Sequence, residues 1–202
     1  MSGIGTVAST PDIAVVTLGV ESSAKTAQQA MAENSANTRA VIDRLKSLGI
    51  ADRHLQTQAL NLNPRYDHRR GNTGHNEPVL TGYQASNVIT ATLTDLTQTG
   101  EIIDAAIKAG SNRVNGIRFA LADPTTALDQ ARAAAWQDAK RKAEQLAALA
   151  GRRLGSVVSI SSHEQHRGPV QEVAMMRMAD AVPIQAGEME LSIQLSVVWA
   201  LE

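Results

Sequence analysis

The stretch that decides the fold is QARAAAWQDAKRKAEQLAALAG, residues 130–151, which contains nine alanines and three consecutive basic residues. Small and apolar residues recur through it at the spacing of one helical face: Leu128, Ala131, Ala135, Ala139, Ala143, Leu146 and Ala150. Lys140, Arg141 and Lys142 point in different directions, because consecutive helical residues are about 100° apart. We therefore interpret this helix as a packing element that lies close to a sheet, and not as a surface for nucleic acid or membrane.

The same reading extends to the rest of the chain. Asp123 and Pro124 are typical of an N-cap and a first helical position, and Gly151 of a helix terminator. Two more helices are predicted at about 24–48 and 98–109, each ending before a glycine. Apolar alternation predicts strands, and the polar segments between them predict loops at 67–78 and 163–186. The predicted strands are 12–22, 54–66, 80–95, 113–122, 155–162 and 189–201.

A helix, a glycine and a strand follow one another three times, in 41–60, 101–121 and 142–161. Their spacing is irregular, which indicates reuse of one supersecondary unit and not a solenoid. Long hairpins mixed with single helices favour an α+β fold, with helices on one face of a largely antiparallel sheet. We expect one domain over 1–202, with two closely packed halves at about 1–95 and 96–202 as the other option.

Composition excludes several classes of protein. The chain has 19 basic and 20 acidic residues, so it lacks the basic surplus of a dedicated nucleic-acid binder. It has no cysteine, which excludes disulfides, thiolate metal sites and a cysteine nucleophile. No apolar run approaches the ~20 residues of a transmembrane helix. The start, MSGIGTVAS, fits a cytosolic protein or an exported one whose signal peptide has been removed.

The sequence contains fragments of catalytic and binding motifs. Residues 3–8, GIGTVA, imitate a dinucleotide-binding loop but precede a strand, so we interpret them as a chance match or a bend. Residues 22–25 match Ser-x-x-Lys without the partner motifs of such hydrolases, and a capping serine explains them better. Four histidines lie in the two predicted loops; a weak imidazole site is conceivable there, but solvated histidines are the commoner case. They are His68, His75, His163 and His166.

The apolar connector 173–184 has neither a strand nor a helix period. Methionine adapts to irregular surfaces, so the connector either folds onto its own core or meets a neighbouring subunit. The candidate assembly contacts are Met175, Met176, Met178, Val182 and Ile184. Surface methionines that absorb oxidant are a third reading.

Several spacings taken together resemble the SIMPL-domain family, from about residue 4 to residue 200. The residues that carry the resemblance are Pro11-Asp12, Gln56-Thr57, Tyr83–Asn87, Gly110–Phe119, Ala131-Arg132, Ala135, Ala139, Lys142-Ala143, Leu146-Ala147, Gly151 and Leu154-Gly155. One departure is visible: the family tends to have Pro-Gly-Glu before the last strand, where this chain has Ala186-Gly187-Glu188.

The resemblance implies an α+β fold, export across the inner membrane to the periplasm or beyond, homo-oligomers, and an association with the cell envelope and with tolerance of oxidative stress. It supplies no catalytic, cofactor-binding or metal-binding residues, and we expect none. We therefore expect a non-enzymatic envelope protein that binds copies of itself. The alternatives are a periplasmic protein that binds a small ligand or peptide, and a hydrolase with a loop-histidine site.

Overall fold

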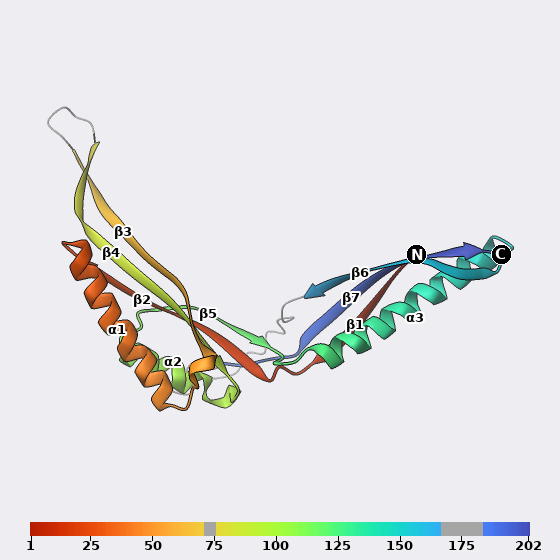
Figure 1. The fold of residues 1–202 in the computed structure, drawn as a ribbon, viewed down its shortest axis with the longest axis horizontal. Helices are drawn as coiled ribbons and strands as arrows, with labels where there is room; N and C mark the ends of the chain where they lie inside the picture. Colours follow the sequence, from red (N-terminus) through yellow and green to blue (C-terminus); the bar gives the residue numbers. More distant parts are fainter. Residues whose placement is uncertain (71–75, 167–183) are drawn as a thin grey trace. The chain divides into compact units, whose positions relative to one another are not determined.

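The computed structural model describes residues 1–70, 76–166 and 184–202, which form two compact units (Figure 1). Unit 2 contains β2 (Ile13–Ala24), α1 (Ala27–Ser47), β3 (Leu55–Arg70), β4 (Asn76–Leu93), α2 (Thr99–Lys108) and β5 (Arg113–Ala120), the last strand ending at its border. Unit 1 contains β1 (Ser2–Ser9), α3 (Thr125–Leu149), β6 (Leu154–His166) and β7 (Met189–Leu201). Two short 3₁₀ turns, Asp52–His54 and Leu96–Gln98, belong to unit 2. The α+β prediction is confirmed.

The units are not consecutive halves of the chain. The N-terminal strand β1 pairs antiparallel with the C-terminal strand β7, from Ser2 opposite Ser196 to Ser9 opposite Met189. Unit 1 is therefore assembled from both ends of the chain plus the segment that carries α3 and β6. The halves 1–95 and 96–202 do not coincide with these units, because a local reading of the sequence cannot see pairing between its two ends.

Unit 2 is a four-stranded sheet in the order β3-β4-β2-β5, with α1 and α2 packed on it. The strand predicted at 12–22 is confirmed as β2, and its residues alternate: Ala14, Val16, Leu18 and Val20 are buried beneath the helices. The strands of the hairpin are longer than predicted, because β3 runs to Arg70 and β4 starts at Asn76. Most of the segment 67–78, which we expected to be a loop, is therefore strand.

A buried asparagine ties α1 to this sheet. Asn34 is fully buried, and its side-chain amide donates hydrogen bonds to the carbonyls of Val20 (2.8 Å) and Ala85 (3.2 Å) on adjacent strands. These bonds bridge β2 and β4 at the level where Val20 lies opposite Asn87. A polar group in such a place sets the position of the helix along the strands, since a shift would leave it unpaired.

Unit 1 is a three-stranded antiparallel sheet in the order β1-β7-β6, covered on one face by α3. Residues Leu191, Ile193, Leu195 and Val197 of β7 point toward the helix and are buried. The two tryptophans, Trp136 of α3 and Trp199 of β7, pack with ring centroids 5.8 Å apart. The predicted bounds of β7, 189–201, are confirmed.

The buried line along α3 differs in detail from the predicted face. The buried residues keep a strict four-residue spacing: Ala127, Ala131, Ala135, Ala139, Ala143 and Ala147. Such a line is one helical ridge, inclined to the axis, and not the axis-parallel face expected from 3.6 residues per turn. Ala147 therefore occupies the place that we predicted for Leu146 and Ala150, both of which are exposed. The helix starts at Thr125 with Pro124 at the cap position, while Asp123 accepts a hydrogen bond from the Thr125 amide.

Two glycines allow α3 to lie against the backbone of β1. A Cβ atom on Gly3 would lie 2.1 Å from the Ala135 carbonyl oxygen, and one on Gly5 would lie 1.9 Å from the Ala131 carbonyl oxygen. Both distances are far below van der Waals contact, so these positions accept only glycine at this helix–strand separation. The segment GIGTVA is thus a strand whose glycines serve packing, and the bend that we expected there is wrong.

We expect Asn34→Ala to destabilise unit 2 by about 1–3 kcal/mol, because two buried carbonyls lose their side-chain donor. Urea unfolding monitored by circular dichroism measures the change. Ser35→Ala, an exposed change on the same helix, is the control. Equal effects of the two substitutions would contradict the role given to Asn34.

We expect Gly5→Ala to destabilise unit 1 by about 1–3 kcal/mol or more, because the new methyl group collides with the backbone of α3. Thr6→Ala, on the exposed face of the same strand, is the matched control and leaves the unfolding midpoint nearly unchanged. Thermal unfolding of both variants tests this, and a neutral Gly5→Ala would show that α3 is free to move away from β1.

Candidate functional site

The predicted histidine site receives no support from the described residues. His163 is exposed on β6 in unit 1, and His166 follows it on the same strand. His68 lies on β3 in unit 2, and His75 lies outside the described residues. The interpretation of these four as solvated histidines stays a prediction, and so does the convergence that the hydrolase alternative requires. Among the side chains that the structure describes, which leave out 68–77 and 164–183, no three histidine, cysteine or carboxylate groups gather closely enough to hold a metal ion.

The Ser-x-x-Lys match also lies in a structural setting. Ser22 is buried on β2 beneath α1, one strand position from the exposed Ser23. The cap that we expected from these serines is supplied instead by Thr26, whose hydroxyl accepts a hydrogen bond from the Gln29 amide (3.2 Å). The match is thus divided between a strand and the turn before the helix.

The candidate assembly contacts divide between described and undescribed residues. Met175, Met176, Met178 and Val182 lie outside the described residues. Ile184 is half-buried and packs against the core of unit 2. Three residues further on, Gly187 has a φ of 61°, a left-handed conformation that glycine adopts without strain. No hydrogen-bonded turn is formed over residues 184–188, so the expected turn before β7 is not seen there, although Gly187 has the conformation that favours glycine.

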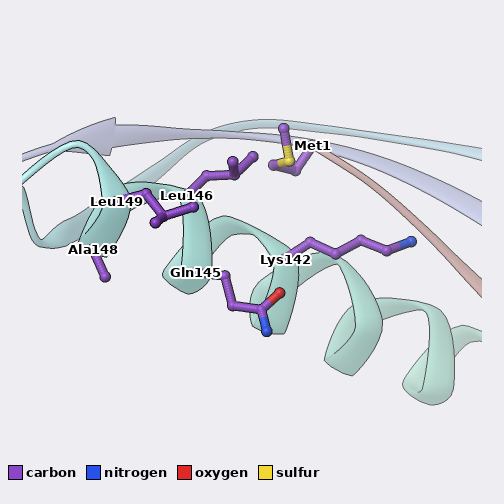
Figure 2. Close-up of a pocket in the computed structure, with 6 residues that line it drawn as sticks. All are labelled: Met1, Lys142, Gln145, Leu146, Ala148 and Leu149. Carbon is purple, nitrogen blue, oxygen red and sulfur yellow. The ribbon is translucent and has the colours of Figure 1, made fainter.

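A concave surface of unit 1 lies at the C-terminal end of α3. A hollow of about 690 Å³ is lined by Met1, Lys142, Gln145, Leu146, Ala148 and Leu149. A smaller hollow of about 240 Å³ shares two of these residues and continues onto the strands; it is lined by Met1, Ala143, Leu146, Ala147, Leu154, Val198, Trp199 and Leu201. Figure 2 shows Leu146 extending from α3 toward Met1 and the strand layer.

Large apolar side chains around these hollows are left uncovered by the rest of unit 1. Leu149 is 84% exposed, and the others are about half exposed. We call this surface the apolar end; its residues are Met1, Leu146, Leu149, Val198 and Leu201. Sequence reasoning missed it because Leu146 was assigned to the buried face and Leu149 to none. The available signal was the pair of leucines that fall off the four-residue alanine ridge.

A small polar cluster borders the apolar end. Asp138 of α3 accepts hydrogen bonds from Lys142 (2.6 Å), from Arg141 (2.7 Å) and from the Ile4 amide of β1 (3.2 Å). Hydrogen bonds from Lys142, Arg141 and the Ile4 amide lower the pKa of the Asp138 carboxyl to about 2. The ammonium group of Lys142 also lies 3.4 Å from the Ser2 carbonyl oxygen. Two side chains of α3 thus contact backbone groups along the free edge of β1.

Comparison with known proteins covers the whole chain. Residues 1–199 match the family model described as "SIMPL: Protein of unknown function (DUF541)". The chain belongs to the SIMPL family. The 26 kDa periplasmic immunogenic protein of Brucella melitensis is 32% identical over 209 residues, covering all of this chain and 84% of that relative. The uncharacterized protein YggE of Escherichia coli K12 is also 32% identical, over 207 residues that cover all of this chain and 82% of YggE.

Residues that carry the SIMPL resemblance have structural roles in unit 2. In the segment Gly110–Phe119, the Ser111 hydroxyl donates to the Gly19 carbonyl, and Asn112 forms two hydrogen bonds with the backbone of Glu21 (2.9 and 2.7 Å). The Asn112 side-chain amide thereby forms with Glu21 the two hydrogen bonds that the backbone of a neighbouring strand would form. Arg113 adds an ion pair with the Glu21 carboxylate at 2.7 Å. These polar side chains hold β5 against β2, and this structural role explains why polar residues stand at these positions.

No helix in the described part of the chain combines the length and the apolar character that a membrane span requires. What the site offers chemically is an apolar hollow beside one carboxylate that is already paired with two cations. Such a surface suits binding through apolar contact, because its charged groups already have partners.

The low pKa of Asp138 predicts a pH dependence for unit 1. Its folded-state pKa of about 2 lies below the ordinary value of 3.8, so its stabilising contribution is complete above about pH 4 and is lost as the pH falls toward 2. Asp138→Asn is therefore expected to lower the urea midpoint at pH 7 and to flatten the loss of stability between pH 4 and pH 2. Glu144→Gln, which removes an exposed pair with Lys140 on the same helix, is the control and changes the midpoint little. Parallel pH profiles for the native chain and Asp138→Asn would refute this role.

Proposed function

We propose that this SIMPL protein is a non-enzymatic component of the cell envelope that acts by assembling with copies of itself. The observation that carries the proposal is the apolar end of unit 1. Exposed apolar side chains that lie side by side around a hollow are characteristic of interaction sites, whereas scattered ones need no explanation. Here Leu146 and Leu149 from α3 meet Val198 and Leu201 from β7 around two adjoining hollows.

The energetics favour a protein partner of similar character. Burying one large apolar side chain contributes ~1.5–3 kcal/mol. The apolar end contains five such side chains, and each is between 47% and 84% exposed. Their full coverage would offset much of the free-energy cost of association, which is on the order of 4–15 kcal/mol. Interfaces between identical subunits are the most apolar class of interface, which suits a surface of this composition.

The setting is proposed from the relatives. The Brucella relative is named as periplasmic, and the matched region spans all of this chain. We infer the same compartment for this protein, in agreement with the export expected from its family resemblance. By the same resemblance, tolerance of oxidative stress is the physiological setting that we propose for the assembly.

A second candidate function is the binding of a small apolar ligand. It is favoured by the volume of the larger hollow, about 690 Å³, which falls within the roughly 300–1,000 Å³ of small-molecule pockets. The open lining by a single helix and Met1 favours a flat partner more than an enclosed ligand. Both candidates use the same leucines, so one pair of variants tests the surface for both.

In solution, we expect a mass several times 21.5 kDa, measured by light scattering after size exclusion. Leu149→Glu places a charge on the apolar end and is expected to shift the mass toward that of the single chain. Because Leu149 is 84% exposed, the substitution should leave the unfolding temperature unchanged.

Ile107→Glu is the matched control, since it puts the same charge on an exposed apolar position of α2 in unit 2. It is expected to keep the native mass. A native protein that remains a single chain at all concentrations would refute assembly. If that single chain bound an apolar probe and the Leu149→Glu variant did not, ligand binding would replace assembly as the proposed function.

A further inference from the structure

The two edge strands of the sheet in unit 1 differ in how their outward backbone groups are covered. The order β1-β7-β6 leaves β1 at one edge and β6 at the other. An edge strand presents unpaired backbone groups that invite pairing with another chain, and proteins usually protect such edges with charges, prolines or covering elements. The protection of each edge therefore indicates which one is available for a partner.

The edge of β1 is protected by α3. Met1 and Val197 exchange two backbone hydrogen bonds (2.6 and 2.8 Å), so the alternation of an antiparallel ladder directs the backbone groups of Ser2 and Ile4 away from β7. These outward groups are the ones that Lys142 and Asp138 contact. A new strand on this side would have to displace both side chains.

Among the residues that the structure describes, none protects the edge of β6 in this way. By the same alternation, the backbone N–H and C=O groups of the even-numbered residues of β7 point toward β6. Ser161 lies opposite Ser196, so its own backbone groups point toward β7. Ile160 and Ser162 then direct their backbone groups outward. No residue that the structure describes forms a hydrogen bond to these outward groups.

The composition of β6 also lacks the usual protection. From Leu154 to His163 it contains no lysine, arginine, aspartate, glutamate or proline. Val157, Val158 and Ile160 are 42%, 67% and 57% exposed. An uncharged, β-branched, exposed edge of this length is the type that pairs with another strand.

We propose that β6 pairs antiparallel with β6 of a second copy, about a two-fold axis at Ser161, so that two three-stranded sheets become one sheet of six strands. This inference rests on the assembly function proposed above and names where two copies meet. The axis places Ile160 opposite Ser162 of the second copy. The outward backbone N–H and C=O groups of these two residues can then form hydrogen bonds with each other.

The charges are compatible with this register. Glu164 comes opposite Val158 of the second copy and His163 opposite Ser159, so no acidic position faces another. A strand with no charge over its first ten residues can also face itself without repulsion.

The β6 seam and the apolar end are separate surfaces of unit 1. With the axis at Ser161, the described part of the seam runs from residue 156 to residue 166, and Leu154, which lines the smaller hollow, lies beyond it. Pairing at β6 therefore covers exposed side chains of β6 such as Val158 and Ile160, and the apolar end offers a second contact.

Cysteine cross-linking tests the axis directly, because the chain has no cysteine of its own. Ser161 would face itself in a non-hydrogen-bonded pair with Cα atoms about 4.5 Å apart, which is within the range of a disulfide. Under mild oxidation, Ser161→Cys is expected to form a covalent dimer at least about ten times faster than Ile4→Cys, because prior assembly raises the effective thiol concentration. Ile4 is the matched control, since it is exposed on the protected edge of the same sheet.

A second pair of variants tests the outward hydrogen bonds. Ser162→Pro removes an amide that points away from β7, a position where edge strands accept proline, whereas Ser162→Ala keeps that amide. We expect the proline variant to weaken association at least about tenfold, as the loss of more than one hydrogen bond at a seam implies, and the alanine variant to associate as the native chain does. Thermal unfolding of both variants checks that unit 1 stays folded.

The outcomes separate this inference from the function on which it rests. An assembled protein in which Ser161→Cys cross-links no faster than Ile4→Cys would overturn the β6 seam and leave assembly standing. A native protein that is a single chain at all concentrations would overturn both. Fast cross-linking at Ser161 together with weakened association of Ser162→Pro would support the seam.

Discussion

The close approach of α3 to the backbone of β1 is the constraint on which unit 1 depends. Two residues of a strand advance by about 6.8 Å and four residues of a helix by about 6 Å, so glycines two apart meet alanines four apart with nearly the same repeat. Gly3 lies against Ala135 and Gly5 against Ala131 in this way. The strand supplies no side chains there and the helix only methyl groups, which lets the two backbones pack almost directly.

That approach explains what the rest of unit 1 exposes. A helix held over β1 and β7 by a ridge of alanines cannot also cover β6, whose residues 156–163 are exposed. Asp138 and Lys142, next to the ridge, come within reach of the β1 edge and occupy it. Among the described residues, this packing geometry thus protects the edge of β1 and leaves both the edge of β6 and the leucines at the end of α3 uncovered.

The polar groups that the structure describes most fully have structural partners. Three polar residues of the segment that carries the SIMPL resemblance, Ser111, Asn112 and Arg113, hold strands together. Asp138, whose carboxyl pKa is lowered to about 2, is paired with two cations and accepts a hydrogen bond from one backbone amide. Strong perturbation of a pKa often indicates catalysis, but structural ion-pair networks produce it equally well, and here the partners are packing elements. The apolar end and the edge of β6 are the surfaces on which the proposed assembly rests.

Local sequence patterns determined the elements of this protein. The alternation in β2 and β7, the helical spacing in α1 and the glycines that end each helix are short-range signals, and these elements lie where the signals place them. Tertiary structure decided everything that depends on distant residues: the pairing of β1 with β7, the division into two units, the burial of Ala147 in place of Leu146, and the reason for Gly3 and Gly5. The apolar end and the β6 edge belong to this second group, because exposure is a property of what neighbouring elements fail to cover, and no stretch of sequence contains that information by itself.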